Sequence, residues 1–380
     1  MQNISSCLSI LIPDGENELL TNHVKDCFAR VPDVRLYVMS NKKSGPSRFS
    51  RYVYKYSYYP KAKNELEWIA NINAELLKHD IDLIMPIFED GIRTLIKFKK
   101  YVKENHKLVV LPVLKDFEIA NNKALLAKHL VENDISGPMI YHINKDNYQA
   151  VKEKDFPLLV KPLNVTDGGS GILLFKQKEE FQDYFKQIKR EHNFIFQEFI
   201  GGYDIDCSVL CDQGDIRAFT IQKGVLYGAK KFAPPIGVQF LYEENLYTVV
   251  KKLMKTLNWS GVAHIDLRFD QNDGKFKVIE VNTRYWGSLD ASLAAGINFP
   301  YLYYLISTNK KFKRPTYNYI EFLSIKGLLK RLKQNAFLIL NGGYLWKNTA
   351  LKFLLLDPIP FIAKILLYIN SYLARFFYKK

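Results

Sequence analysis

Short apolar runs alternate with longer amphipathic stretches over the first third of the chain. The apolar runs have the length of buried strands, and the stretches between them carry apolar residues at helical spacing. The runs predict strands at 6–12, 34–40, 82–88 and 107–111, and the stretches predict helices that include 65–79 and 91–104. Strands and helices that alternate in this way are typical of a parallel sheet covered by helices. The pattern therefore predicts an α/β unit at the N-terminus.

The pattern changes after a predicted helix at 116–134, where Asp116 is a plausible N-cap. Two apolar runs within 158–175 then flank a glycine-rich turn. Within 194–210 a strand that leads into Gln197-Glu198 is followed by a bend at Gly201-Gly202 and a second, alternating strand. Alternating residues predict further strands at 215–222 and 225–232, and a helix is expected at 243–257. Strands of period two that follow one another with turns between them indicate an antiparallel meander.

Polar side chains alternate along both strands of a hairpin predicted within 261–284, around the turn Gln271-Asn272-Asp273-Gly274. The alternating residues are His264, Asp266 and Arg268 on the first strand and Glu280, Asn282 and Arg284 on the second. Period two places each set on one face, and residues directly opposite each other lie about 5 Å apart. Asp266 and Glu280 converge if the register allows it. Carboxylate and amide oxygens are hard ligands that suit Mg²⁺, whereas the alternative is a solvent-facing strand.

Two further features have a functional and a structural interpretation. The glycine-rich turn at 166–171 could wrap a phosphate with its backbone N–H groups, or be the flexible tip of a hairpin. Glu89 and Asp90 follow a predicted strand at the end where open α/β sheets bind ligands, or they begin a helix. The chain has neither the dinucleotide-binding fingerprint G-x-G-x-x-G nor a P-loop.

Composition and charge narrow the class of protein. The chain has 380 residues, enough for two or three domains, and a net charge of +15. Residues 301–380 hold fourteen Lys or Arg and two acidic residues, a net of +12, which leaves +3 for the first 300 residues. This distribution argues against a nucleic-acid-binding fold. The four cysteines lack metal-site or disulfide spacing, and the N-terminus resembles a first strand rather than a signal peptide, so we expect a cytoplasmic protein.

The last thirty residues, 351–380, are apolar but interrupted by Asp357, Pro358 and Pro360. The run after Pro360 is shorter than the about 20 apolar residues that a membrane-spanning helix needs. It predicts an amphipathic helix with Lys364 and Arg375 on its polar face. Such a helix packs on the protein's own core, pairs with a second subunit in a homodimer, or lies on the inner, anionic face of a membrane.

The ordered set of motifs resembles the ATP-grasp superfamily, in particular its carboxylate–amine ligases. The motifs are Lys123 in NNK, Lys161 in LLVKP, and the stretches TDGGSG, QEFIGGYD, AHIDLRF and VIEVNTR. The resemblance covers roughly residues 1–310. It implies a mixed α/β fold with an N-terminal parallel α/β pre-ATP-grasp domain at 1–115 and a two-lobed ATP-grasp domain at 116–310, whose small lobe is about 135–198. A basic, mostly helical region at 311–380 follows.

The resemblance also implies roles for individual residues. The expected nucleotide contacts are Lys123, Lys161, Thr166, Gly168, Gly169, Ser170, Gly171, Gln197, Glu198, Phe199, Ile200 and the ribose-binding Asp204, where many relatives have Glu. The expected magnesium ligands are Asp266, Glu280 and Asn282. Arg284, Lys161 and His264 would be catalytic, with His264 at a position where some relatives carry arginine. Glu89, Asp90 and Arg268 would contact the substrate.

The activity implied by the resemblance is an ATP-dependent ligation that needs Mg²⁺ or Mn²⁺. A small-molecule carboxylate would be activated as an acyl phosphate, with release of ADP, and an amine would then displace phosphate. Such chemistry depends on positioning and charge neutralisation more than on a covalent group of the protein. The alternative is a nucleotide-binding module without catalysis, possibly associated with a membrane, although the charged residues of the motifs are all present.

Overall fold

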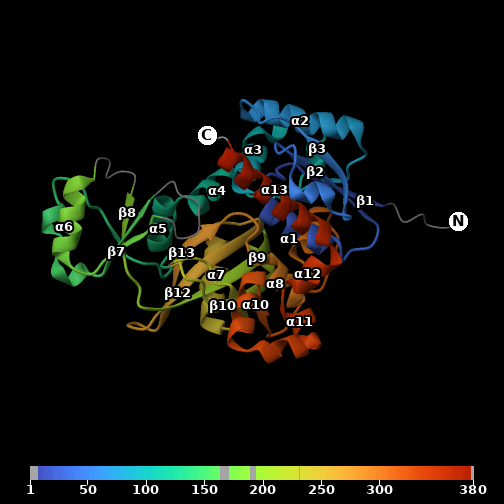
Figure 1. Cartoon of the computed structure of the whole chain (residues 1–380). Helices are drawn as coiled ribbons and strands as arrows, with labels where there is room; N and C mark the ends of the chain where they lie inside the picture. Colours follow the sequence, from blue (N-terminus) through green and yellow to red (C-terminus); the bar gives the residue numbers. More distant parts are fainter. Residues whose placement is uncertain (1–6, 163–170, 189–193, 231, 378–380) are drawn as a thin grey trace.

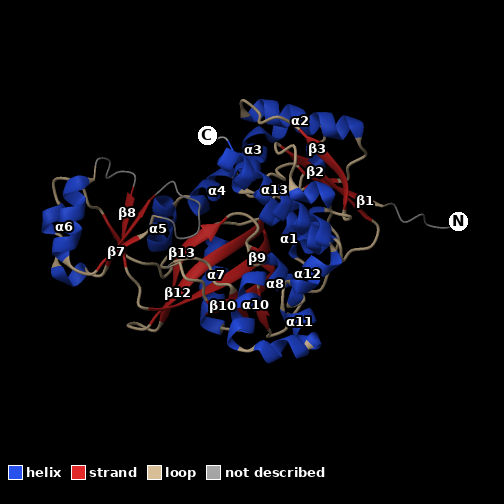
Figure 2. Cartoon of the chain, in the orientation of Figure 1, coloured by secondary structure: helices blue, strands red, loops and turns tan. Residues whose placement is uncertain are grey.

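The computed structural model describes residues 7–162, 171–188, 194–230 and 232–377, with side chains described up to residue 370 (Figure 1). The described chain forms three sheets with helices packed around them (Figure 2). The fold is mixed α/β, as the sequence predicted, with a parallel sheet at the N-terminus and antiparallel strand pairs in the other two sheets.

The N-terminal sheet has four parallel strands in the order β3-β2-β1-β4. The strands are β1 (Leu8–Ile12), β2 (Val34–Ser40), β3 (Val53–Tyr58) and β4 (Leu83–Ile84). Helix α1 (Glu18–Phe28) packs on one face, and α2 (Glu65–Lys78) and α3 (Glu89–Phe98) pack on the other. One prediction is wrong here, because the expected strand at 107–111 makes only an isolated bridge, between Leu108 and Ile84. Edge strand β3 was not predicted, because its side chains are half-exposed or exposed and show no clean apolar run.

The single helix predicted at 116–134 is two helices, α4 (Leu114–Asn121) and α5 (Lys123–Glu132). Asn122 breaks the helix because its backbone is extended, and its side-chain oxygen accepts hydrogen bonds from the N–H groups of Ala124 and Leu125. Asp116 lies inside the first turn of α4 and is not its N-cap, which is Val113.

A small lobe with its own core follows. Its sheet has the order β5-β8-β6-β7, with β5 (Ile140–Tyr141), β6 (Leu158–Pro162), β7 (Leu173–Phe175) and β8 (Phe194–Glu198). Helix α6 (Lys178–Gln187) covers the sheet and buries Phe181 and Phe185 against Phe196. This lobe projects away from the rest of the molecule (Figure 1).

The largest sheet has six strands in the order β13-β12-β9-β10-β11-β14. Its strands are β9 (Gly202–Asp212), β10 (Asp215–Leu226), β11 (Gly237–Leu241), β12 (Gly261–Asp270), β13 (Lys275–Asn282) and β14 (Glu321–Leu323). The meander is confirmed, but the runs at 215–222 and 225–232 do not form two strands, because β10 continues to Leu226 and pairs with β11. Helix α7 (Glu244–Thr256) packs against the apolar face of this sheet.

The remaining α-helices lie between residues 289 and 377. They are α8 (Leu289–Ala294), α9 (Phe299–Ser307), α10 (Ile325–Gln334), α11 (Gly342–Asn348), α12 (Leu351–Leu356) and α13 (Pro358–Phe377). The predicted C-terminal helix is confirmed, and it begins directly after Asp357. None of the helices in the described ranges is long and apolar enough to cross a membrane.

Asp14, in the turn after β1, fixes the start of α3. The side chain is 3% exposed, and its carboxylate accepts hydrogen bonds from the backbone N–H groups of Ile87 (3.0 Å) and Phe88 (2.9 Å). These N–H groups belong to the last residues before α3, where no helical partner is available to them. The contact therefore sets the position of Glu89 and Asp90, the first two residues of the helix.

Replacing Asp14 by alanine is expected to lower the free energy of unfolding by about 1–3 kcal/mol, because it leaves buried N–H groups without an acceptor. Chemical denaturation followed by circular dichroism measures this change. Asp80→Ala, at an exposed position of the same domain, is the matched control and should leave stability unchanged. Equal stability of the two variants would contradict the proposed role of Asp14.

Candidate active site

Polar side chains form a row across four strands of the largest sheet. The register pairs Glu280 of β13 with Asp266 of β12, Asp266 with Asp206 of β9, and Asp206 with Gln222 of β10. The apolar residues that alternate with them, such as Ile265 and Cys207, face α7 in the core. The hairpin is thus confirmed, and its register, shifted by a β-bulge between Asp266 and Leu267, brings Asp266 opposite Glu280. The row continues two strands beyond the hairpin.

A second row runs beside the first and contains Asn282, His264, Ser208 and Thr220. The Nδ1 atom of His264 lies 2.9 Å from Ser208 Oγ, and its Nε2 atom lies 3.3 Å from Asp266 Oδ1. The imidazole also stacks on Trp286. Burial, and the nearby charge of Arg284, lower the pKa of His264 to about 3. His264 is therefore a neutral imidazole beside the carboxylates.

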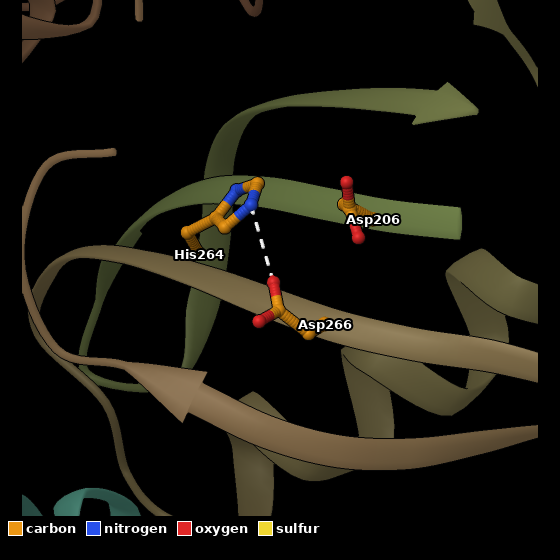
Figure 3. Close-up of side chains that lie close together, drawn as sticks. All are labelled: Asp206, His264 and Asp266. Carbon is orange, nitrogen blue, oxygen red and sulfur yellow. Dashed lines mark ion pairs between the residues drawn. The ribbon is translucent and has the colours of Figure 1, made fainter. Parts of the chain in front are cut away.

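Asp206, His264 and Asp266 point toward one another (Figure 3), and one ligand atom from each lies within 4.8 Å of the others. Burial and the neighbouring Glu280 raise the pKa of Asp266 well above its ordinary value, and burial raises that of Asp206 to about 7. Like charges in a dry environment cause these shifts, and a bound cation would relieve them. Sequence reasoning missed Asp206, although it alternates with Asp204 on the same strand face.

Asp266, Glu280 and Asn282, the three residues predicted to bind a metal, lie together. The Asn282 side-chain nitrogen is 3.2 Å from Asp266 Oδ2, and Asp266 and Glu280 are cross-strand partners. Carboxylate and amide oxygens gathered in one half-buried place form the donor set that Mg²⁺ prefers. The residues therefore fit a magnesium ion.

Two lysines from different elements approach the same carboxylates. Lys123, the first residue of α5, has its Nζ 3.8 Å from Glu280 Oε2. Lys161 is on β6, and desolvation lowers its pKa to about 8, while Glu280 and Asp266 act in the opposite direction. Both lysines line a small pocket of about 70 Å³ together with apolar residues of the small lobe and the hairpin, including Ile140, Ile195, Val278 and Ile279.

Arg284 follows β13 and reaches across to the N-terminal domain. Its Nε donates to Glu89 Oε1 at 2.8 Å, its Nη1 to the Tyr285 carbonyl at 2.8 Å, and its Nη2 to Asn282 Oδ1 at 3.3 Å. The structure thus brings Glu89 to the site, where it holds the guanidinium beside a predicted metal ligand. Asp90, the next residue of α3, is exposed.

The segment expected to form the hinge connects the small lobe to β9. Gln197 is buried and lines the pocket, and the Glu198 carboxylate accepts a hydrogen bond from the Met139 N–H at 3.0 Å. The Phe199 N–H donates to the Pro157 carbonyl at 3.2 Å. Arg268 donates to the Ile200 carbonyl at 2.7 Å.

Arg268 also pairs with Asp204 and donates to the Gly202 carbonyl at 3.0 Å. Its described contacts therefore hold the bend that joins the hinge to β9.

Of the predicted glycine-rich loop, Thr166, Gly168, Gly169 and Ser170 lie outside the described residues. Gly171 is described, with φ of +75°, a conformation that favours glycine.

Most residues of this site lie in a region that is similar to known proteins. A family model described as an ATP-grasp domain matches residues 120–288. A carbamoyl-phosphate synthase of Methanobrevibacter smithii is 22% identical over 235 residues, which cover 58% of this chain and 62% of that protein. A D-aspartate ligase of Enterococcus faecium is 24% identical over 177 residues, which cover 42% of this chain and 41% of that protein.

The fold is also shared with solved structures. The L-amino acid ligase of Bacillus licheniformis superposes with a TM-score of 0.59 at 18% identity, over 80% of this chain and 75% of that one. The chain spans less than two thirds of the length of the two curated relatives. The matched domain includes Lys123, Lys161, Asp266, Glu280, Asn282 and Arg284. Residues 120–288 therefore form an ATP-grasp domain.

Proposed function

We propose that this chain is an ATP-dependent ligase that joins a small-molecule carboxylate to an amine. The observation that carries the proposal is the meeting of two lysines, a row of carboxylates and a preoriented arginine at one place. A D-aspartate ligase and an L-amino acid ligase, both named for acting on amino acids, are among the similar proteins. An amino acid as one of the two substrates is the simplest class consistent with them.

Asp266, Glu280 and Asn282 would hold magnesium, and Asp206 lies next to Asp266 in the same row. When bound, Mg²⁺ supplies positive charge that neutralises the phosphate oxygens. Lys123 and Lys161 would bind the phosphates of ATP from the opposite side. The pocket between the small lobe and the hairpin would hold the adenine, with Asp204 at the ribose, although Asp204 is also paired with Arg268.

In the proposed reaction, a carboxylate oxygen of the substrate attacks the γ-phosphorus of ATP. The bond from that phosphorus to the β,γ-bridging oxygen breaks, ADP leaves, and an acyl phosphate remains. The amine nitrogen then attacks the acyl carbon, the C–O bond to phosphate breaks, and inorganic phosphate and a proton are released. Arg284 neutralises charge on the transferred group, and His264, as a neutral imidazole, adds none.

The first test is the thermal midpoint of the purified protein with and without Mg-ATP. A nucleotide at a hundredfold over its dissociation constant adds about 2.7 kcal/mol to stability, so we expect a clear, magnesium-dependent rise of the midpoint. ADP release is then measured with pairs of amino acids and other carboxylates and amines. A folded protein without a midpoint shift would contradict nucleotide binding. A shift without ADP release from any pair would favour the non-catalytic alternative.

A further inference from the structure

Helix α13 presents large apolar side chains to solvent along its described length. The exposed residues, each with 38–72% of its surface accessible, are Ile359, Phe361, Ile362, Ile365, Leu366, Leu367, Tyr368 and Ile369. Ile359, Ile362, Leu366 and Ile369 follow one another at steps of three, four and three, which places them in one stripe on the helix. Single exposed apolar residues are ordinary, but a continuous apolar surface of this kind marks an interaction site.

The start of α13 is fixed to the N-terminal domain. Asp357 is 4% exposed, and its carboxylate accepts hydrogen bonds from Lys25 Nζ at 2.7 Å and Ser50 Oγ at 2.5 Å. The short helical turn η1 (Pro46–Phe49) lies against both α1 and α13. In Figure 1, α13 accordingly lies beside α1. The exposed stripe is therefore held in a defined place and is not a loose tail.

A basic loop from a distant part of the sequence lies beside this helix. Residues 41–51, which include η1, contain no acidic residue, and the basic side chains of the loop are all exposed: Lys42, Lys43, Arg48 and Arg51. Phe49, in the same loop, is 46% exposed. Residues 358–380 likewise contain no acidic residue and four basic ones. An apolar stripe and a cationic loop thus adjoin each other on the molecule.

We propose that α13 and the loop 41–51 bind the surface of an anionic lipid membrane. The apolar stripe would enter the boundary between headgroups and acyl chains, and the loop would contact anionic headgroups. The helix would lie in the surface, since the described chain has no helix suited to cross a membrane. A cytoplasmic membrane face fits the four free cysteines.

The charge of this surface favours an anionic membrane over a second copy of the chain as its binding partner. In a two-fold dimer the same patch meets itself, so each basic loop would approach the other copy's stripe and loop. The loop and the helix offer no acidic partner for those charges, and like charges oppose such a contact. A membrane that contains anionic lipids offers acyl chains to the apolar stripe and anionic headgroups to the basic loop. The inference does not depend on the proposed ligase activity.

The test is sedimentation of the full-length protein with vesicles of phosphatidylcholine alone or of phosphatidylcholine mixed with phosphatidylglycerol. Binding is expected only to the anionic vesicles, and high salt should weaken it because salt screens exposed charges. The double variant Ile362→Glu/Leu366→Glu should abolish binding. Leu77→Glu is the matched control, since Leu77 is 72% exposed on α2, across the N-terminal sheet from α1, and should bind as the unaltered protein does.

A second pair of variants tests the loop separately. Lys43→Gln/Arg48→Gln is expected to lower the vesicle partition coefficient about thirtyfold, the effect of removing two basic residues from an anionic surface. Lys145→Gln, at an exposed position of the small lobe, is the control. The proposal would be overturned if the protein bound neither type of vesicle. It would also be overturned by binding that survives the changes in α13, or by a dimer in solution that those changes dissociate while vesicle binding is absent.

Discussion

Replacing Arg284 by glutamine is expected to lower turnover about a hundred- to a thousandfold, while the binding of Mg-ATP persists. Removal of one preorganised donor from a site of developing charge typically has an effect of this size. Arg284 is suited to the role because three contacts, to Glu89, Asn282 and the Tyr285 carbonyl, fix its guanidinium, and its side chain is 18% exposed. Steady-state ADP release and the thermal shift with Mg-ATP measure the two properties.

The matched control for this change is Arg217→Gln, since Arg217 is an exposed arginine of β10. It should leave both turnover and nucleotide binding unchanged. If Arg284→Gln also turned over at the rate of the unaltered protein, Arg284 would have no part in the transfer, and its contacts would serve only to join the two domains.

Features set by local sequence could be predicted, and the hairpin that carries the metal ligands is the clearest example. Period two assigned Glu280 and Asn282 to one face of their strand and Asp266 to the polar face of the facing strand. The period and the turn lie within about twenty residues, so tertiary contacts were not needed to interpret them. The exact pairing was not predicted, because the turn register alone would place Asp266 opposite Ile279, and a β-bulge between Asp266 and Leu267 brings it opposite Glu280. The alternation of apolar runs and amphipathic stretches in the N-terminal third predicted most of the sheet for the same reason. The exceptions are β3, an edge strand without an apolar run, and the expected strand at 107–111, which forms only an isolated bridge.

Contacts between distant segments could not be predicted from a single sequence. Asp206 joins the site through the pairing of β9 with β12, and Arg284 meets Glu89 across 195 positions of the chain. Asp357, which interrupts an apolar run, is the buried partner of Lys25, 332 positions away. Each of these depends on how separate elements pack. Asn122 is the contrary case, because its capping signal is local but the amphipathic pattern continues through it.

Replacing Glu280 by glutamine is expected to lower turnover at least about a thousandfold and, unlike Arg284→Gln, to reduce the thermal shift with Mg-ATP. The change removes one of the two carboxylates that would hold the metal, and charge stabilisation by a bound metal is worth several kcal/mol at a phosphoryl group. It also removes the charge that faces Lys123 at 3.8 Å. Calorimetric titration with Mg-ATP, together with ADP release, measures both losses.

Asp273→Asn, at the tip of the same hairpin, is the control and should behave as the unaltered protein does, because Asp273 lies outside the two polar rows.

The substitution at 280 should also bring the pKa of Asp266 back toward its ordinary value, since Glu280 is one cause of its rise. Partial recovery at high magnesium would then show that Asp266 and Asn282 still bind the ion weakly. A variant with the full magnesium-dependent shift would remove Glu280 from the metal site and leave Asp206, beside Asp266 in the row, as the second carboxylate.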